Sequence, residues 1–343
     1  MIYMKAGKLP PEKLQSLVLG RFSHRRADVL VPARLGEDSA IIDFGDVVCV
    51  ISTDPITGAA SGAGRLAVHV SCNDVAANGA EPIGVQVVLL LPVNTCEKDI
   101  ARLMDEIEAG CRELGIEVLG GHTEITSKVN DPVIITTAIG RAARSEYVTS
   151  SNCRVGDDVV VTKGIGLEGT AILATDWGYL IEQKAQEKNL RPPATDWLEK
   201  ARSFADEVSA VRDGMLAARY GVSAMHDVTE GGLYGGLYEL GQASGVAFRI
   251  ETSLLPVRAE TAFICAALGL DPLGLISSGS MLICCPDGKG LVQRLNNADI
   301  PAFVIGKAVA GKESYLLDTH GNSTILPLLA EDELWRFLAT IAK

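Results

Sequence analysis

Apolar and polar segments alternate through the first half of the chain and predict strands and helices in turn. Residues 39–43 and 47–53 are rich in Ile and Val and are separated by a short turn, so they predict a β-hairpin. Residues 64–79 are mostly small or apolar and end at a glycine, which predicts a helix. The unbroken apolar run at 85–91 suits a strand that is covered on both faces.

Helical periodicity returns at 95–114, where apolar residues recur every three or four positions and would pack on the sheet. A short strand at 116–119 then leads into Gly120-Gly121. Residues 132–139 predict the last strand of this half. The first half therefore mixes helix and strand around one sheet.

A Ser-rich stretch and a polar turn near residue 150 predict a domain boundary. They separate a first domain, 1–150, from a second domain, 151–343. The second domain opens with a strand at 158–162 and continues as alternating helices and strands. The pattern predicts two domains of the α/β or α+β class.

The charge balance argues against two kinds of partner. The 343 residues include 43 acidic and 31 basic side chains, for a net charge of −12, which opposes binding to nucleic acid or to anionic membranes. No apolar run approaches the roughly 20 residues of a membrane-spanning helix, and the N-terminus lacks a signal-peptide pattern. The eight cysteines lack disulfide or zinc spacing and suit free thiols. We therefore expect a soluble, cytoplasmic protein.

Five carboxylates stand beside glycines or at predicted element ends: Asp38, Asp54, Asp74, Glu124 and Asp227. A side chain just past a strand end lies at the rim of the sheet, where a ligand can reach it. Asp74 lies inside an otherwise apolar helix, beside Asn73, and needs a metal, a hydrogen-bond donor or a cation as its partner. Because Mg²⁺ prefers carboxylate, water and phosphate oxygens, the joint pattern predicts a site for Mg²⁺ and a nucleotide.

Each acid also has a structural explanation. Asp38 and Asp54 suit turns or caps, and Asp74 suits a buried ion pair. Glu124 suits an exposed loop, and Asp227 suits a cap for the helix that follows it. These separate explanations do not account for the joint pattern, so the metal site remains the favoured interpretation.

Glycines and histidines lie next to these acids in the sequence. Gly231-Gly232 begin a predicted helix, whose bare backbone N–H groups can bind a phosphate, and Gly120-Gly121 could do the same. His122 and His226 could each carry a proton near neutral pH or serve in packing.

A competing hypothesis comes from Gly164, Gly166 and Gly169, which spell G-x-G-x-x-G between a predicted strand and a helix. This is the fingerprint of an NAD-binding oxidoreductase. The strand ending in Asp or Glu that should follow about 20 residues later is replaced by a polar, helix-like segment. A tight strand-to-helix turn is the simpler explanation.

Five motifs together resemble one family of ATP-dependent proteins. They are Gly36-Glu37-Asp38-Ser39-Ala40, Ser52-Thr53-Asp54, the block from Asn73-Asp74 to Glu81-Pro82, Gly120-Gly121-His122-Thr123-Glu124, and Asp227-Val228-Thr229-Glu230-Gly231-Gly232. The chain resembles the superfamily that includes aminoimidazole ribonucleotide (AIR) synthase, HypE, thiamine-monophosphate kinase and selenophosphate synthetase. The resemblance implies a two-domain α+β PurM-like fold. Its N-terminal α+β domain would pair with a twin subunit in a barrel-like homodimer, and its C-terminal α/β domain would help to hold Mg-ATP in the cleft between the domains.

The resemblance also assigns roles to residues. It implies that Asp38, Asp54, Asp74 and Asp227 bind Mg²⁺, and that the first, second and fourth of these also contact the nucleotide. It places Thr53, Asn73, Gly120, Gly121, Gly231 and Gly232 at the nucleotide as well. Asp74, Glu124 and His122 would act in catalysis.

Within this superfamily the chain looks most similar to HypE, a hydrogenase-maturation factor. HypE proteins carry a terminal cysteine that is carbamoylated and then dehydrated, whereas the last cysteine here is Cys285. We therefore expect an ATP- and Mg²⁺-dependent enzyme that phosphorylates or activates a small-molecule or carbamoyl-type oxygen, with a possible protein partner in maturation. The alternatives are a nucleotide-binding maturation or scaffold protein without turnover, and the NAD-dependent oxidoreductase.

Overall fold

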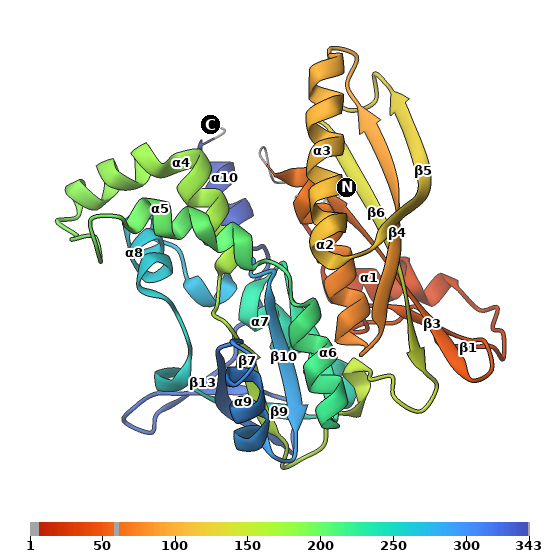
Figure 1. The fold of residues 1–343 in the computed structure, drawn as a ribbon. Helices are drawn as coiled ribbons and strands as arrows, with labels where there is room; N and C mark the ends of the chain where they lie inside the picture. The colour runs from red at the N-terminus through yellow and green to blue at the C-terminus, as the bar shows by residue number, and fades with distance from the viewer. Residues whose placement is uncertain (1–6, 58–61, 342–343) are drawn as a thin grey trace.

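Two halves lie side by side in the computed structural model, and each is built on one β-sheet (Figure 1). The structure describes residues 7–57 and 62–341. Within these ranges, no helix is both long and apolar enough to cross a membrane.

The first half forms a six-stranded sheet in the order β1-β2-β3-β6-β4-β5. Its strands are β1 (Val29–Val31), β2 (Ala40–Asp43), β3 (Val47–Ile56), β4 (Glu81–Leu91), β5 (Glu117–Ile125) and β6 (Val133–Ala143). β4 and β5 run parallel, and the other neighbouring pairs are antiparallel. The predicted hairpin is confirmed as β2 and β3.

β3 extends beyond its predicted end at residue 53, so Asp54 lies within the strand. The pairing of β3 with β2 stops at Ile51, and from there to Ile56 its ladder runs only with β6. A proline is tolerated where one edge of a strand has no partner, which explains Pro55 inside this strand.

Helices α2 (Ala63–Ala77) and α3 (Glu97–Leu114) cover one face of the sheet. α3 buries only a stripe that includes Leu103 and Ile107, as the periodicity predicts. α2 is buried along nearly its whole length, because the sheet packs on one side of it and the second half of the chain on the other. A shorter helix, α1 (Pro11–Leu17), has no buried residue.

Among the described residues, no helix covers the opposite face of this sheet. Ile51, Ile135, Ile139 and Val88 are neighbours across strands on this face and are half-buried. The edge strand β5 is exposed at every position. An open apolar face and an open edge therefore lie on the side away from α2 and α3.

The second half contains a seven-stranded sheet in the order β13-β12-β9-β11-β7-β10-β8. Its strands are β7 (Asp158–Thr162), β8 (Ala224–Val228), β9 (Ala247–Glu251), β10 (Ser280–Cys285), β11 (Ala302–Val309), β12 (Tyr315–Leu317) and β13 (Ser323–Ile325). Only β9 and β12 pair in parallel among these described strands. The expected α/β domain is therefore a mixed, mainly antiparallel α+β domain.

Helices cover both faces of this second sheet. They are α4 (Leu167–Glu187), α5 (Trp197–Arg202), α6 (Val211–Tyr220), α7 (Gly232–Ser244), α8 (Ala259–Leu268), α9 (Gly288–Asn296) and α10 (Glu333–Ile341). α7 packs on one face, α6 and α9 pack on the other, and α4, α5, α8 and α10 share a further apolar cluster.

The two halves meet where α2 crosses α6. Gly214 on α6 lies against the backbone of α2, and a Cβ at this position would lie 2.4 Å from the carbonyl oxygen of Ala76. The absence of a side chain therefore allows the two helices to approach closely. This contact fixes α2 at the centre of the molecule.

Candidate functional site

A cavity of about 550 Å³ lies between the two halves. The first half contributes residues from the segment before β2, from the end of β3 and from α2, and the second half contributes residues from β8, α4, α7 and α10. A cleft between domains is a common location for a small-molecule site.

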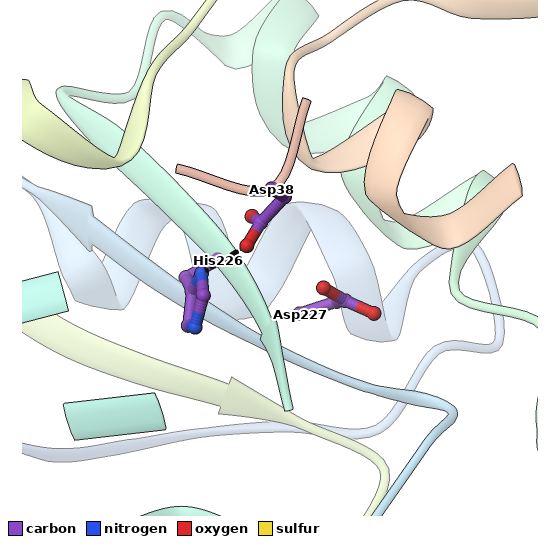
Figure 2. Close-up of side chains that lie close together, drawn as sticks. All are labelled: Asp38, His226 and Asp227. Carbon is purple, nitrogen blue, oxygen red and sulfur yellow. Dashed lines mark ion pairs between the residues drawn. The ribbon is translucent and has the colours of Figure 1, made fainter. Parts of the chain in front are cut away.

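Four of the predicted acids converge on this cavity from four separate segments. Asp38 precedes β2, Asp54 lies near the end of β3, Asp74 lies in α2, and Asp227 lies in β8. Figure 2 shows Asp38 above the strand that carries His226 and Asp227. One ligand atom from each of these three residues lies within 4.8 Å of the others, which is close enough to share a metal ion.

Asp74 is buried within α2, at 8% exposed. Its side chain accepts a hydrogen bond of 2.5 Å from the hydroxyl of Ser52 on β3. Burial raises the pKa of Asp74 well above its usual value, and the nearby carboxylates of Asp54 and Asp227 raise it further. The donor that the sequence analysis required is therefore Ser52, although one hydroxyl does not neutralise the carboxylate.

His226 supplies a buried positive charge beside this cluster. Its Nδ1 lies 2.5 Å from Asp38 Oδ1, and its Nε2 lies 3.0 Å from Glu239 Oε2. Burial alone would lower the pKa of His226, but Asp38 and Glu239 outweigh it and hold this pKa well above 6.5. The imidazole is therefore a cation that fixes Asp38 rather than a free metal ligand.

The remaining negative charge is not compensated within the described chain. Burial and the Asp38 carboxylate raise the pKa of Asp227 to about 7, although His226 opposes the shift. Among the described residues, Asp54 Oδ2 and Asp227 Oδ2 are buried and have no hydrogen-bond partner. Buried carboxylate oxygens without a partner, on acids that line one cavity, suit a hard divalent cation such as Mg²⁺.

A lysine from the N-terminal segment reaches the edge of this cluster. The ammonium of Lys8 lies 3.2 Å from Glu239 Oε1, and its backbone N–H donates to Glu230. Burial raises the pKa of Glu239, but Lys8 and His226 outweigh it and lower this pKa to about 2. Glu239 therefore stays ionised and holds both cations in place.

Two predicted nucleotide residues have other contacts in the structure. Asn73 donates its amide to the carbonyl of Val208 and accepts from the backbone N–H of Ala210, so it ties α2 to the second half. Thr53 lies on the open face of the sheet, where its hydroxyl bonds that of Thr137. Neither residue lines the cavity.

The backbone N–H groups of the two glycines at the start of α7 also have partners. The N–H of Gly231 donates to Asp332, and the N–H of Gly232 donates to the carbonyl of Thr229. A Cβ at Gly232 would lie 2.6 Å from the carbonyl oxygen of Leu273. These glycines allow the chain to pack closely, and their N–H groups are not free to bind a phosphate as predicted.

The predicted glycine loop at 120–121 is part of β5. A Cβ at Gly121 would lie 1.8 Å from the carbonyl oxygen of Val87 on β4, so close strand packing explains this glycine. His122 and Glu124 are exposed on the same strand, and their side chains lie 3.7 Å apart. β5 is at the far edge of the sheet from β2, and within one chain it does not line the cavity.

The G-x-G-x-x-G segment forms a tight turn between β7 and α4. β7 is flanked by the antiparallel strands β10 and β11, whereas a dinucleotide-binding unit needs a parallel neighbour. A Cβ at Gly169 would lie 2.5 Å from the side chain of Leu275. Protein atoms fill the space beside this turn, so the NAD hypothesis is not supported.

Glu168 and Glu239 also line the cavity and were not singled out as ligands from the sequence. Glu239 lies on α7 outside the five motifs, and Glu168 is the second residue of α4, inside the G-x-G-x-x-G segment. Helical spacing places Glu239 two turns after the glycines of the Asp227 motif, and this spacing was the only available signal.

The fold and the cavity together define a two-domain PurM-like protein. Family models of the AIR synthase related protein match the chain over residues 36–142 for the N-terminal domain and 154–318 for the C-terminal domain. The chain belongs to the AIR synthase related family, as its motifs predict.

Curated relatives cover nearly the same length. A putative hydrogenase expression/formation protein of Methanocaldococcus jannaschii is 27% identical over 96% of each chain. Carbamoyl dehydratase HypE of Rhizobium leguminosarum bv. viciae is 28% identical over 88% of this chain and 86% of that protein.

Solved structures confirm the predicted fold. HypE in its complex with HypF superposes with a TM-score of 0.73 at 20% identity and covers 92% of this chain and 99% of that chain. HypE in complex with ATP superposes with a TM-score of 0.66 at 21% identity and covers 97% of this chain and 98% of that chain.

Proposed function

We propose that this protein is an ATP- and Mg²⁺-dependent enzyme that transfers the γ-phosphoryl group of ATP to an oxygen atom of an acceptor. The convergence of Asp38, Asp54, Asp74 and Asp227 from both halves of the chain carries the proposal. The names of its relatives, which include carbamoyl dehydratase and selenide, water dikinase, and a HypE structure in complex with ATP support it.

The four aspartates would hold Mg²⁺, and the orphaned oxygens of Asp54 and Asp227 are the groups it would satisfy. Bound Mg²⁺ neutralises charge on the phosphates of the nucleotide. His226 and Glu239 keep Asp38 in position through ion pairs on either side of the imidazole. The chain itself contributes placement and charge, which are the main protein contributions to phosphoryl transfer.

The acceptor is a carbamoyl-type or other small molecule. Its oxygen attacks the γ-phosphorus, the bond to ADP breaks, and a phosphorylated or activated acceptor results. The relatives named carbamoyl dehydratase favour a carbamoyl oxygen as the attacking group.

We also propose that the protein is a homodimer that forms through the open face of the first sheet. The half-buried isoleucines on this face suit an interface because an apolar surface gains from burial. The dimer would bring the exposed β5 of one subunit toward the cavity of the other, which gives Glu124, His122, Gly120 and Gly121 a place in catalysis and nucleotide binding.

The proposed domains, 1–150 and 151–343, meet in the segment between β6 and β7.

A second candidate is a nucleotide-binding maturation protein without turnover. The complex of HypE with HypF supports a protein partner for a chain of this fold. ATP turnover in the purified protein alone would exclude this candidate.

Calorimetry with Mg²⁺ and the ATP analogue AMPPCP tests the nucleotide site, and ADP release tests turnover. The acceptors are a carbamoylated cysteine peptide, thiamine monophosphate and formylglycinamidine ribonucleotide. We expect micromolar binding that requires Mg²⁺ and ADP release with at least one acceptor. Absence of Mg²⁺-dependent binding would refute the proposal.

A further inference from the structure

A second, smaller chamber of about 180 Å³ adjoins the main cavity. It lies between the start of α2 on one side and α4 with the segment 203–208 on the other. Leu66, Glu168 and Ile172 line both spaces, so the chamber and the main cavity meet at these side chains. The chamber is smaller than the roughly 300 Å³ at which drug-sized sites begin, so it suits one small group rather than a nucleotide.

Glu168 lies where the chamber and the main cavity meet, and one of its carboxyl oxygens has no hydrogen-bond partner within the described chain. The residue is only 5% exposed, and within the described chain its Oε2 has no hydrogen-bond partner. Burial raises the pKa of Glu168 to about 7, although hydrogen bonds from Ser278 oppose the shift, and the carboxylate of Glu230 adds to it. A buried carboxyl oxygen without a partner is costly, so the position suits a ligand that donates a hydrogen bond.

One face of α4 lines the chamber from Glu168 to the rim. Ile172, Thr175 and Asp176 follow at helical spacing. Asp176 is exposed at the rim, and partial burial of its carboxyl group raises its pKa. The polar groups that α4 presents are therefore two carboxyls and a hydroxyl.

Arg65 is the only basic side chain among the described residues that line this chamber, and its charge is already paired with Glu113. Its Nε donates to both carboxylate oxygens of Glu113, at 2.9 and 3.0 Å. Its Nη1 donates to the carbonyl of Ala205 at 2.8 Å. An anionic ligand in the chamber would therefore meet acids without a free cation to compensate it.

We propose that this chamber is the acceptor subsite, that it takes a small uncharged or cationic group through an N–H or O–H donated to Glu168, and that it excludes anionic groups. The proposal rests on the proposed function, which places the nucleotide in the main cavity. It deepens that function because it selects among acceptors. Amides, amidines and alcohols fit, whereas an acceptor that must insert a phosphate or carboxylate does not.

Three probes of one shape and different charge test this selection: benzamidine, which is cationic at neutral pH, benzamide and benzoate. Each is titrated by calorimetry into the full-length protein that is saturated with Mg²⁺ and AMPPCP. We expect benzamidine and benzamide to bind and benzoate to bind at least tenfold more weakly. Equal or tighter binding of benzoate, or no binding of any probe, would overturn the proposal.

Glu168→Gln tests the residue. It removes the acidic oxygen with almost no change in volume, and we expect it to weaken benzamidine binding at least tenfold. Glu182→Gln, at an exposed position on the same helix, is the matched control and should leave binding unchanged. An unchanged affinity in a folded Glu168→Gln protein would contradict the assignment.

The same titrations separate this proposal from the proposed function. AMPPCP binding is measured first without probes, and the probes are then also titrated without nucleotide. If AMPPCP fails to bind while the probe series holds, the proposed function fails and the chamber's selectivity stands. If AMPPCP binds but displaces the probes, the chamber belongs to the nucleotide site and the acceptor assignment is wrong.

Discussion

His226 Nδ1 lies 2.5 Å from Asp38 Oδ1, so one ion pair joins the two halves of the molecule at the cavity. Asp38 comes from the segment before β2, and His226 comes from β8 in the second sheet. The pair therefore positions one predicted metal ligand from across the domain junction. It also leaves the other three aspartates as the acids whose charge is not compensated in this way.

Mg²⁺ should stabilise the folded protein, because it binds carboxylates that come together only on folding. At a 100-fold excess over its dissociation constant, a ligand adds about 2.7 kcal/mol to the free energy of unfolding. Thermal unfolding with and without Mg²⁺ measures this effect. The gain should disappear in Asp74→Asn and persist in Asp105→Asn, which alters an exposed acid on α3.

Asp74→Asn should abolish ADP release yet raise stability in metal-free buffer. The pKa of Asp74 is raised by burial and by Asp54 and Asp227, so the ionised side chain destabilises the fold. Removing the charge should add roughly 1–2 kcal/mol to the free energy of unfolding. Urea denaturation in EDTA checks the direction, and a large loss of stability would contradict the described charge cluster.

Asn73→Ala should destabilise the protein by about 2–3 kcal/mol, because the carbonyl of Val208 and the N–H of Ala210 both lose their buried partner. Affinity for AMPPCP should change less than in Asp74→Asn, since Asn73 does not line the cavity. Denaturation and calorimetry on the same two variants make the comparison. The reverse ranking would restore Asn73 to the nucleotide site.

Glu168→Gln should gain stability relative to the wild type as the pH rises. The pKa of Glu168 is raised from 4.5 to about 7, so the folded protein holds this proton more tightly than the unfolded chain. The contribution is fully present below pH 4.5 and is lost as the pH rises through about 7, with an upper limit of about 3 kcal/mol. Denaturation at pH 5 and pH 8 compares wild type, Glu168→Gln and the Glu182→Gln control.

Two inactive variants should restore activity when they are mixed, if β5 serves the neighbouring subunit. Asp74→Asn and Glu124→Gln homodimers should each lose ADP release. A mixed dimer joins an intact Asp74 of one chain with an intact Glu124 of the other, so random exchange should restore about a quarter of wild-type activity. If ADP release does not recover after subunit exchange has been verified, each active site is built from one chain alone.

The core of the first sheet was predictable, because runs such as 85–91 have the composition of covered strands and the motifs mark its turns. The four aspartates at the cavity were predictable as a set, since each stands at a recognisable motif. The sequence could not show that Asp54 lines the cavity and Thr53 does not. Adjacent residues of a strand point to opposite faces of the sheet, and only the fold shows which face is covered.

The glycine motifs were harder to interpret because a glycine serves close packing and ligand binding equally well. Gly121 is explained by β4, and Gly232 by the chain at Leu273 and Leu275. Glu168 could not be recognised as buried with one unpartnered oxygen, since its environment comes from residues more than 60 positions away, such as Glu230 and Ser278.

Helix α2 has a consequence for how the chain folds. Two adjacent residues of this helix have different roles: Asn73 ties it to the second half of the chain, and Asp74 lines the cavity. Other residues of the same helix complete the core of the first sheet. Ala77, near its end, belongs to the apolar cluster of the second half. The first half expressed alone would leave one side of α2 exposed to water, and the second half alone would lack the surface on which it packs. The molecule therefore has two sheets but a single cooperative folding unit.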